Sequence, residues 1–342
     1  MKKINYTKKP EINYGLNFNY DLIRLFQRHK FSNKKIILIT GLTSFKKTKY
    51  YGNLKKILTE FEIDILHEIS VDKNPTWDKI NKTKHIVANT DIIMCIGGGS
   101  VIDFGKAIKL HSNKNSKIFV IYTIPGSASI VTPFTIFNNK EFKIGEHSEK
   151  ILPDYVYINK NILKKIPVNL LQIGMFDILT HITESYMSKI STRKSRLYAI
   201  KALRFLNLYI EGNQTNYLPL VKSDILAGLS ERTSLVLFPH AIGHYLTFKN
   251  KIAHGLATMY FFNKFLYLIL SKGAIIPNEI LILVKKFNII FQKKYKTNLF
   301  FSKKEINKSY KLIDKYMPFT FKNSPVILGK VDYLILYKEY EK

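Results

Sequence analysis

Three histidines fall within the stretch PHAIGHYLTFKNKIAHG, which runs from Pro239 to Gly255. His240 and His244 are four residues apart, so on a helix both imidazoles can point in one direction. The segment MFDILTHITESY places Asp177 and His181 at the same spacing. Imidazole and carboxylate groups are common ligands of Zn²⁺ and of non-haem Fe²⁺. These residues are therefore candidate metal ligands, although a single pair at this spacing is more often a surface or capping contact.

A metal site that includes the third histidine requires a reversal of the chain. His254 lies fourteen residues after His240. On one continuous helix the two would be about 21 Å apart, too far to share an ion. The polar run Lys249, Asn250 and Lys251 is suited to a turn between them. The metal hypothesis therefore predicts that the helix breaks near these residues.

With that reversal, four residues would supply one carboxylate and three imidazoles: Asp177, His181, His240 and His254. This mixed set suits Fe²⁺ or Zn²⁺ and does not distinguish the two ions. Such an ion can act as a Lewis acid on an alcohol or carbonyl oxygen if one coordination position stays open. His244 would lie one turn from a ligand and be free to move protons.

A glycine triplet is suited to a cofactor that carries phosphate. Gly97, Gly98 and Gly99 follow an apolar run, and a helix is expected from Ser100. Glycine permits close approach of a ligand and positive φ, and the first N–H groups of a helix favour a pyrophosphate. The motif is not the G-x-G-x-x-G dinucleotide fingerprint. Taken alone, the triplet fits an ordinary tight turn equally well.

The loop that follows an earlier strand-like run bears on the choice of cofactor. An acidic residue at this place commonly holds the adenosine ribose of NAD. Here Gly41 takes that place, and Ser44, Lys46 and Lys47 follow. Hydroxyl and ammonium groups suit a 2′-phosphate, so we expect NADPH to be preferred over NADH. The alternative is a basic surface loop in a lysine-rich chain.

The elements that must position these residues form two halves. In the first half, apolar runs alternate with segments of helical period, and the apolar runs cover residues 34–40, 62–69, 91–97 and 117–125. This alternation predicts a parallel sheet with helices on both faces. Beyond Pro167, long segments of helical period dominate. We therefore expect a Rossmann-like α/β dinucleotide-binding domain over residues 1–165 and an all-helical metal-binding domain over residues 166–342.

Charge is the most unusual feature of the composition. The 342 residues carry a formal net charge of +29. The lysines are scattered along the chain, and no helix-turn-helix, zinc-finger or RNA-binding motif is present. A solvated lysine-rich surface therefore explains the charge better than specific nucleic-acid binding. The charge should still attract anionic ligands.

Three further observations predict a cytoplasmic protein without a membrane partner. The single cysteine, Cys95, excludes an intrachain disulfide and fits a reducing compartment. The first residues lack the apolar region of a secretory signal. The longest apolar stretches, FLYLIL and EILILV, are far shorter than the roughly 20 residues of a membrane helix.

Together, these motifs resemble those of the iron-containing, or group III, alcohol dehydrogenases, over roughly residues 11–260. The family motif G-G-G-S-x-x-D is matched by Gly97, Gly98, Gly99, Ser100 and Asp103. The motif D-x-x-x-H-x-x-E is matched by Asp177, His181 and Glu184, and H-x-x-x-H followed by H-G by His240, His244 and His254–Gly255. The threonine–glycine loop is matched by TIPGSASIVTPF (123–134), with Ser127 and Ile130 as departures.

The resemblance implies a dehydroquinate synthase-like fold with the active site in the cleft between its two domains. It implies that Asp177, His181, His240 and His254 bind a divalent metal, with Fe²⁺ expected first and Zn²⁺ as the alternative. His244 is then suited to proton relay beside the metal. Thr123 and Lys143 fall where the family contacts the cofactor, as do the glycines. The LTSFKK loop is similar to that of the NADPH-using branch.

The resulting expectation is a metal-dependent alcohol dehydrogenase that works as an NADPH-dependent aldehyde reductase, assembled as a homodimer or higher homo-oligomer. Only 87 residues follow Gly255 (342 − 255), so we expect a shortened carboxy-terminal region and a more open substrate pocket. With the basic surface, this suggests a small anionic aldehyde such as phosphonoacetaldehyde. Three alternatives stay open: a glycerol-type polyol dehydrogenase, a nucleic-acid-binding protein on a degenerate dehydrogenase fold, and a metal-free structural homologue.

Overall fold

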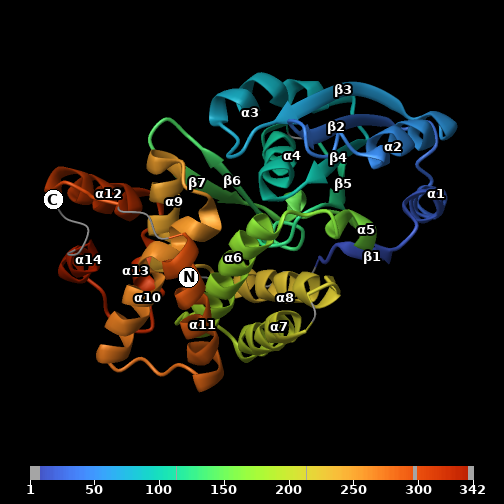
Figure 1. Cartoon of the computed structure of the whole chain (residues 1–342). Helices are drawn as coiled ribbons and strands as arrows, with labels where there is room; N and C mark the ends of the chain where they lie inside the picture. Colours follow the sequence, from blue (N-terminus) through green and yellow to red (C-terminus); the bar gives the residue numbers. More distant parts are fainter. Residues whose placement is uncertain (1–7, 113, 213, 296–298, 338–342) are drawn as a thin grey trace. The chain divides into compact units, whose positions relative to one another are not determined.

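The computed structural model describes residues 8–112, 114–212, 214–295 and 299–337, and Figure 1 traces them. The chain divides into two compact units. The first holds the described part of Tyr6–Lys140 together with Ile144–Pro167, and the second holds Glu141–Lys143 with the described part of Val168–Lys342.

The first unit is built on a six-stranded sheet in which every pair of neighbours is parallel. The strand order is β1-β8-β5-β4-β2-β3. Their bounds are β1 (Glu11–Gly15), β2 (Lys35–Gly41), β3 (Asp64–Val71), β4 (Ile92–Gly97), β5 (Lys117–Tyr122) and β8 (Tyr155–Asn159). The central strands are continuous apolar runs because both of their faces are buried. A second sheet pairs β6 (Phe134–Asn138) with β7 (Lys143–His147).

Helices cover both faces of the six-stranded sheet. Alternate strand residues such as Leu38 and Met94 form one core with Leu22 and Leu54 of the helices α1 and α2. On the other face α4 packs so closely that a Cβ on Gly105 would lie 2.3 Å from Cys95 Sγ. The bounds are α1 (Phe18–Arg28), α2 (Lys49–Glu60), α3 (Trp77–Thr83), α4 (Gly99–Ser112) and α5 (Lys160–Leu163), with 3₁₀ helices η1 (Lys84–Asn89) and η2 (Glu149–Ile151).

The expected Rossmann-like sheet is confirmed, with local differences. Between β3 and β4 the helix α3 is α-helical only to Thr83, and the chain continues as the 3₁₀ helix η1. The sheet also contains β1 and β8, which the apolar pattern did not indicate. Each of these strands is five residues long. They pair with each other although they are far apart in the sequence, so the local apolar pattern could not predict their pairing.

The second unit is helical from Val168 onward, as the sequence predicted. The helix α6 contacts α7, α8 and α10, and α9 packs against α10 (Figure 1). No helix in the described part of the chain combines the length and apolar character needed to cross a membrane. The bounds are α6 (Val168–Met187), α7 (Arg193–Glu211), α8 (Leu218–Ser234), α9 (Phe238–Asn250), α10 (His254–Ser271), α11 (Asn278–Lys294), α12 (Lys303–Tyr316), α13 (Phe319–Lys322) and α14 (Lys330–Tyr337).

Candidate active site

Three polar residues of α6 are buried on one side of the helix. Asp177, His181 and Glu184 occupy positions i, i+4 and i+7, a spacing that keeps them on one face. Their exposed fractions are 7%, 5% and 0%. The rest of α6 is mostly apolar, so the helix is anchored by packing against its neighbours. Buried ionisable groups are costly unless they are paired or bind a metal, so this face is a candidate functional site.

The chain reverses between His240 and His254, as the metal hypothesis requires. The helix α9 ends at Asn250, and Lys251 adopts a left-handed conformation with φ 57°. A new helix, α10, begins at His254 itself. The two helices pack closely where a Cβ on Gly243 would lie 2.7 Å from Thr258 Cγ2. The turn therefore returns His254 toward the helix that carries His240.

A second close approach brings the start of α10 against α6. A Cβ on Gly255 would lie 2.1 Å from the backbone oxygen of Ile173 and 3.3 Å from Cβ of Asp177. Only glycine fits this contact without a shift of the backbone. The Gly of the H-G motif thus allows His254 to lie near Asp177.

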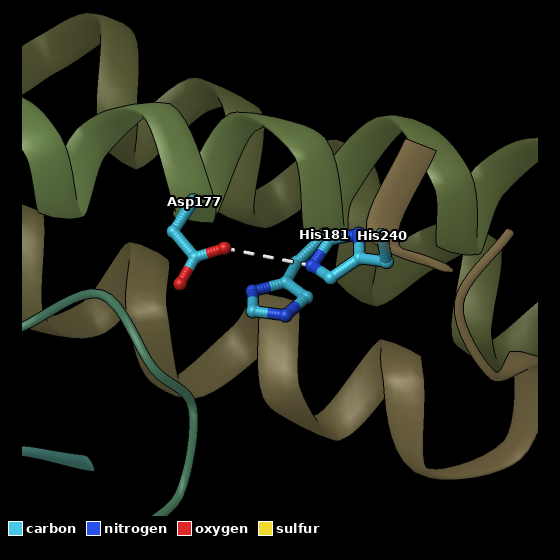
Figure 2. Close-up of side chains that lie close together, drawn as sticks. All are labelled: Asp177, His181 and His240. Carbon is cyan, nitrogen blue, oxygen red and sulfur yellow. Dashed lines mark ion pairs between the residues drawn. The ribbon is translucent and has the colours of Figure 1, made fainter. Parts of the chain in front are cut away.

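Asp177, His181 and His240 form a compact group of potential metal ligands. One ligand atom from each residue lies within 4.8 Å of those from the other two. Nε2 of His240 lies 3.5 Å from Oδ1 of Asp177. The rings of His181 and His240 are stacked with centroids 4.5 Å apart. Figure 2 shows the Asp177 carboxylate directed toward His240, with the ring of His181 beside it.

The fourth predicted ligand, His254, lies beside this group. Its Nε2 is 3.8 Å from Oδ1 of Asp177, and its ring centroid is 5.4 Å from that of His240. The side chain is 22% exposed, whereas that of His240 is 2% exposed. The compact group of three does not include it. The structure thus brings three predicted ligands together and places the fourth at their more exposed side.

The buried polar atoms of this group fit a metal ion. Oδ1 of Asp177, Nδ1 of His181, Nε2 of His240 and Nδ1 of His254 have no hydrogen-bond partner. Leaving a buried polar atom without a partner costs about 1–3 kcal/mol. An ion held by nitrogen and oxygen atoms would satisfy several of them at once. The donor types suit Zn²⁺ and Fe²⁺.

Two further carboxylates contact the imidazoles of the group. Oε2 of Glu184 lies 2.8 Å from Nδ1 of His240 and accepts the backbone N–H of Leu237 at 2.6 Å. Oε2 of Glu231, on α8, lies 3.5 Å from Nε2 of His181. Each of these histidines therefore has one ring nitrogen near a glutamate and the other without a hydrogen-bond partner.

The pKa values of the two stacked histidines shift in opposite directions. Burial lowers the pKa of His181, and the Asp177 carboxylate offsets only part of that effect. Burial would also lower the pKa of His240, but the carboxylates of Glu184 and Asp177 raise it above its ordinary value. In the metal-free protein we therefore expect a neutral His181 beside a protonated His240.

His244 lies next to the group with a defined tautomer. Its ring centroid is 5.1 Å from that of His254, and its Nδ1 donates to the backbone oxygen of Lys143 at 2.9 Å. Burial, followed by the positive charge of Lys143, lowers the pKa of His244 well below its ordinary value. The ring is therefore neutral near pH 7, with Nε2 as its proton acceptor.

The predicted phosphate-binding residues meet at the carboxyl ends of β2, β4 and β5. Gly97 ends β4, and the backbone N–H of Thr123 donates to its oxygen at 3.2 Å. A Cβ on Gly98 would lie 2.2 Å from Ile124 Cγ2, and a Cβ on Gly99 would lie 2.7 Å from Ser127 Cβ. None of the three glycines has a positive φ. Glycine is needed here for close packing of the loop, not for a left-handed backbone.

The other residues of this motif hold the loop in place. Asp103 is buried, and its Oδ1 accepts from the hydroxyl of Ser129 at 3.0 Å. The hydroxyl of Ser100 accepts from the backbone N–H of Asn74 at 3.2 Å. Ile130, one of the two departures from the motif of the threonine–glycine loop, is fully buried.

The loop after β2 carries the residues expected to determine the preference for NADPH over NADH. Gly41 ends β2, and a Cβ there would meet only Ser44 Oγ at 3.7 Å. Nζ of Lys46 lies 2.8 Å from Glu68 and donates to the hydroxyl of Ser70 at 2.9 Å. The positive charge of Lys46 is thus already paired on β3. Lys143, the remaining cofactor candidate, belongs to the second unit, where its backbone contacts His244.

Parts of this sequence are similar to those of known enzymes. The model of the family "Iron-containing alcohol dehydrogenase" matches residues 11–160. Alcohol dehydrogenase 4 of Saccharomyces cerevisiae is 25% identical over 230 residues, which are 60% of this chain and 60% of that enzyme. The chain is therefore similar to iron-containing alcohol dehydrogenases, and the family model matches less than half of its length.

Another curated relative matches a larger share of the chain. The NADPH-dependent butanol dehydrogenase of Clostridium saccharobutylicum is 23% identical over 281 residues, covering 74% of this chain and 71% of that enzyme. The chain spans only about 60% of the length of the yeast alcohol dehydrogenases of Saccharomyces cerevisiae and Schizosaccharomyces pombe.

Two solved structures share the fold over 98% of the chain. One, described as an iron containing alcohol dehydrogenase, aligns with a TM-score of 0.82 at 24% identity and covers 98% of each chain. The sulfoacetaldehyde reductase of Bifidobacterium kashiwanohense, solved with NAD⁺, aligns with a TM-score of 0.79 at 15% identity over 98% of each chain. At these identities the likeness concerns the fold.

Sequence reasoning missed two features of the site. Glu231 had no recognised role, because an isolated glutamate on a mixed helix gives no signal of what it will contact. The backbone oxygen of Lys143 also escaped notice, because its partner His244 is 101 residues away. Glu184 was visible only as the last residue of a motif, although its i+7 spacing from Asp177 indicates the same helix face.

Proposed function

We propose that this chain is a metal-dependent alcohol dehydrogenase, working as an aldehyde reductase with NAD(P)H. The observation that carries the proposal is the group of buried ligand atoms without hydrogen-bond partners on Asp177, His181 and His240. A protein without a metal has no evident reason to bury these atoms unpaired. The use of NAD(P)H is proposed from the family match and from the glycine turn at the end of β4.

Asp177, His181 and His240 would hold the divalent ion, with His254 completing the set from the start of α10. Fe²⁺ is proposed as the ion and Zn²⁺ as the alternative. When bound, the ion supplies Lewis acidity toward the alcohol or carbonyl oxygen. Burial of Asp177 and the two stacked histidines excludes water from most of the ligand set.

His244 is proposed as the proton relay. Its Nδ1–H is engaged by the oxygen of Lys143, so only Nε2 is available for proton exchange. Because its pKa is well below the ordinary value, the ring does not store a proton near neutral pH. His244 would therefore accept a proton from the alcohol in one direction and pass one from water in the other.

The nicotinamide cofactor supplies the hydride. Gly97, Gly98, Gly99 and Ser100 are proposed to hold its pyrophosphate at the start of α4, and Asp103 to fix the neighbouring loop. Thr123 and Lys143 are proposed as further cofactor contacts. Gly41, Ser44 and Lys46 would surround the adenosine ribose, and we propose NADPH over NADH because this loop offers hydroxyl and ammonium groups.

A small aldehyde with an anionic group, such as phosphonoacetaldehyde, is proposed as the substrate. The charge of Lys143 lowers the pKa of both His244 and His254, so a positive charge acts beside these imidazoles. The net charge of +29 has the same sign. A reductase of another anionic aldehyde, sulfoacetaldehyde, shares the fold. A cytoplasmic location and assembly as a homodimer or higher homo-oligomer remain part of this proposal.

The proposal is tested on protein purified without oxygen. Metal content is measured by elemental analysis, and oxidation of NADPH and NADH is followed with a panel of aldehydes. One bound divalent metal per chain and turnover of an aldehyde are expected. Absence of both would refute the function. Equal kcat/KM for phosphonoacetaldehyde and a neutral aldehyde of similar size would refute the anionic substrate alone.

A further inference from the structure

Two buried glutamates outside the proposed ligand set contact its imidazoles. Glu184 is fully buried, and its Oε2 lies 2.8 Å from Nδ1 of His240. Glu231 has a side chain that is 12% exposed, and its Oε2 lies 3.5 Å from Nε2 of His181. The two glutamates lie on different helices, α6 and α8, so the histidines are approached separately.

The carboxylate of Glu184 is fixed independently of any metal. It accepts the backbone N–H of Leu237, the residue that precedes the first turn of α9. Leu237 offers no side-chain cap, so the glutamate from α6 binds at the start of the helix that carries His240. One carboxylate oxygen thereby links the position of α9 to the orientation of the His240 ring.

The contacts with the two glutamates determine which nitrogen of each imidazole, His240 and His181, remains available to bind a metal. Since Nδ1 of His240 faces Glu184, its Nε2 is left on the side of Asp177, 3.5 Å from Oδ1. Since Nε2 of His181 faces Glu231, its Nδ1 is the atom left without a partner. The two available nitrogens are therefore chemically different: Nε2 on one ring and Nδ1 on the other.

We infer that Glu184 and Glu231 are positioning residues for the metal site, holding His240 with Nε2 and His181 with Nδ1 directed toward the ion. The inference rests on the proposed function, because it assigns roles around the same ion. A histidine that binds a metal commonly donates its other N–H to a carboxylate, which fixes the ring and makes the ligand nitrogen more basic. Both glutamates occupy that place.

Charge supports the same assignment. The proposed ligand set contains only one carboxylate, that of Asp177, for an ion of charge +2 in a chain of net charge +29. Two more carboxylates beside the imidazoles would offset this excess where the surroundings are weakly polarisable. The effect of Glu184 should be larger, because it is more deeply buried and closer to its histidine.

A purely structural role makes a different prediction. If Glu184 served only to cap α9 through Leu237, its loss would destabilise the metal-free protein and leave metal affinity unchanged. Metal affinity and the spectrum of a bound ion therefore separate the two roles, and catalytic activity is not needed for the comparison.

The experiment uses the full chain, freed of metal with a chelator. Zn²⁺ affinity is measured by competition with a chromophoric chelator, and Co²⁺ is added to record its visible absorption. The variants are Glu184→Gln, which removes the charge with little change of shape, Glu184→Ala and Glu231→Gln. The matched control is Glu146→Gln, because Glu146 also contacts an imidazole, that of His111 at 2.7 Å, outside the ligand set.

We expect Glu184→Gln to raise the Kd for Zn²⁺ by about 10-fold to 100-fold and to change the Co²⁺ absorption. Glu231→Gln should raise the Kd for Zn²⁺ and change the Co²⁺ absorption to a smaller extent. Glu146→Gln should change neither the Kd nor the absorption. Thermal unfolding of each metal-free variant shows whether it is folded, and Glu184→Gln decides the matter if Glu184→Ala does not fold.

Wild-type Kd and an unaltered Co²⁺ spectrum in both folded glutamine variants of the site would overturn the inference while leaving the proposed function intact. A Glu184→Gln variant that is only less stable would assign that residue to helix capping. If the wild-type protein bound neither Zn²⁺ nor Co²⁺, the proposed function itself would fail.

Discussion

At the scale of single residues, the site is defined by which atoms have partners and which do not. His240 and His181 have their rings stacked at 4.5 Å, yet their pKa values shift in opposite directions. The cause is the number of carboxylates around each ring: Glu184 and Asp177 surround His240, while burial dominates at His181. Identical residue types therefore have different chemistry because of their neighbours.

Metal binding should become stronger as the pH rises. In the metal-free protein His240 holds a proton up to a pH above its ordinary range, because its pKa is raised. A metal ligand must give up that proton, so the ion competes with protons at every pH below the raised pKa. Because one proton must leave His240 on binding, the Kd for Zn²⁺ should fall by up to about tenfold per pH unit between about pH 6.5 and about pH 8.5.

This pH effect is measured by titration at several pH values and by calorimetry in two buffers with different heats of ionisation. The second measurement counts the protons released on binding. Release of no proton near pH 7 would mean that His240 is neutral before the metal arrives.

Loss of the imidazole at position 244 should separate catalysis from metal binding. His244→Gln removes the group whose Nε2 is proposed to exchange protons, while the amide can still donate toward Lys143. Because general acid–base groups contribute about 10²-fold to 10⁴-fold, kcat should fall by about 10²-fold or more. Metal content, measured by elemental analysis, should be that of the wild type. A variant that loses its metal would instead identify His244 as a ligand.

At the scale of elements, two close helix contacts determine where the histidines can lie. The turn at Lys251 reverses the chain, and α10 then meets α6 at Gly255. The backbone oxygen of Ile173 leaves no room there for a side chain. The position of His254 relative to Asp177 thus depends on a residue that carries no functional group.

A methyl group at position 255 should displace the start of α10. In Gly255→Ala the new Cβ would lie 2.1 Å from the oxygen of Ile173, so the backbone must move. We expect a loss of about 1–3 kcal/mol in the free energy of unfolding and weaker Zn²⁺ binding. Urea denaturation and metal titration measure the two effects.

The control for this substitution is Gly52→Ala on the exposed face of α2, where a Cβ would meet nothing within 4 Å. Alanine is the better helix former, so this variant should gain up to about 1 kcal/mol. If Gly255→Ala behaved like Gly52→Ala, the contact between α10 and α6 would not be as close as described.

At the scale of the whole molecule, net charge is the dominant electrostatic property. With a net charge of +29, like charges repel one another over the surface of the folded chain. Several lysines are paired locally, as Lys46 and Lys55 are with Glu68, but only 25 acidic residues face 54 basic ones. Most of the positive charge must therefore be balanced by solvent ions.

The protein should become more stable as salt is added. Screening acts over about 30 Å at 0.01 M salt and about 8 Å at 0.15 M, so added NaCl weakens the repulsion. We expect Tm to rise across this range, as measured by thermal unfolding in a low-salt buffer. The same series with sucrose, which does not screen charge, provides the control. A fall in Tm with NaCl would mean that the ion pairs outweigh the repulsion.

The amino-acid sequence by itself determined the central strands, the long helices and the motif residues. The apolar runs of β2, β4 and β5 and the period of α6 and α7 are local properties, and so are the four-residue spacings of Asp177–His181 and His240–His244. These patterns predicted the fold class, and the polar run at Lys249–Lys251 predicted the break between α9 and α10.

Only the tertiary structure decided which residues contact one another in the candidate site. The pairing of β1 with β8, the contact of Glu184 with His240 across 56 residues and that of Glu231 with His181 all join segments that are distant in sequence. Local periodicity cannot encode such contacts, because they depend on how helices and strands pack. The same packing decides which nitrogen of each imidazole is left for a metal.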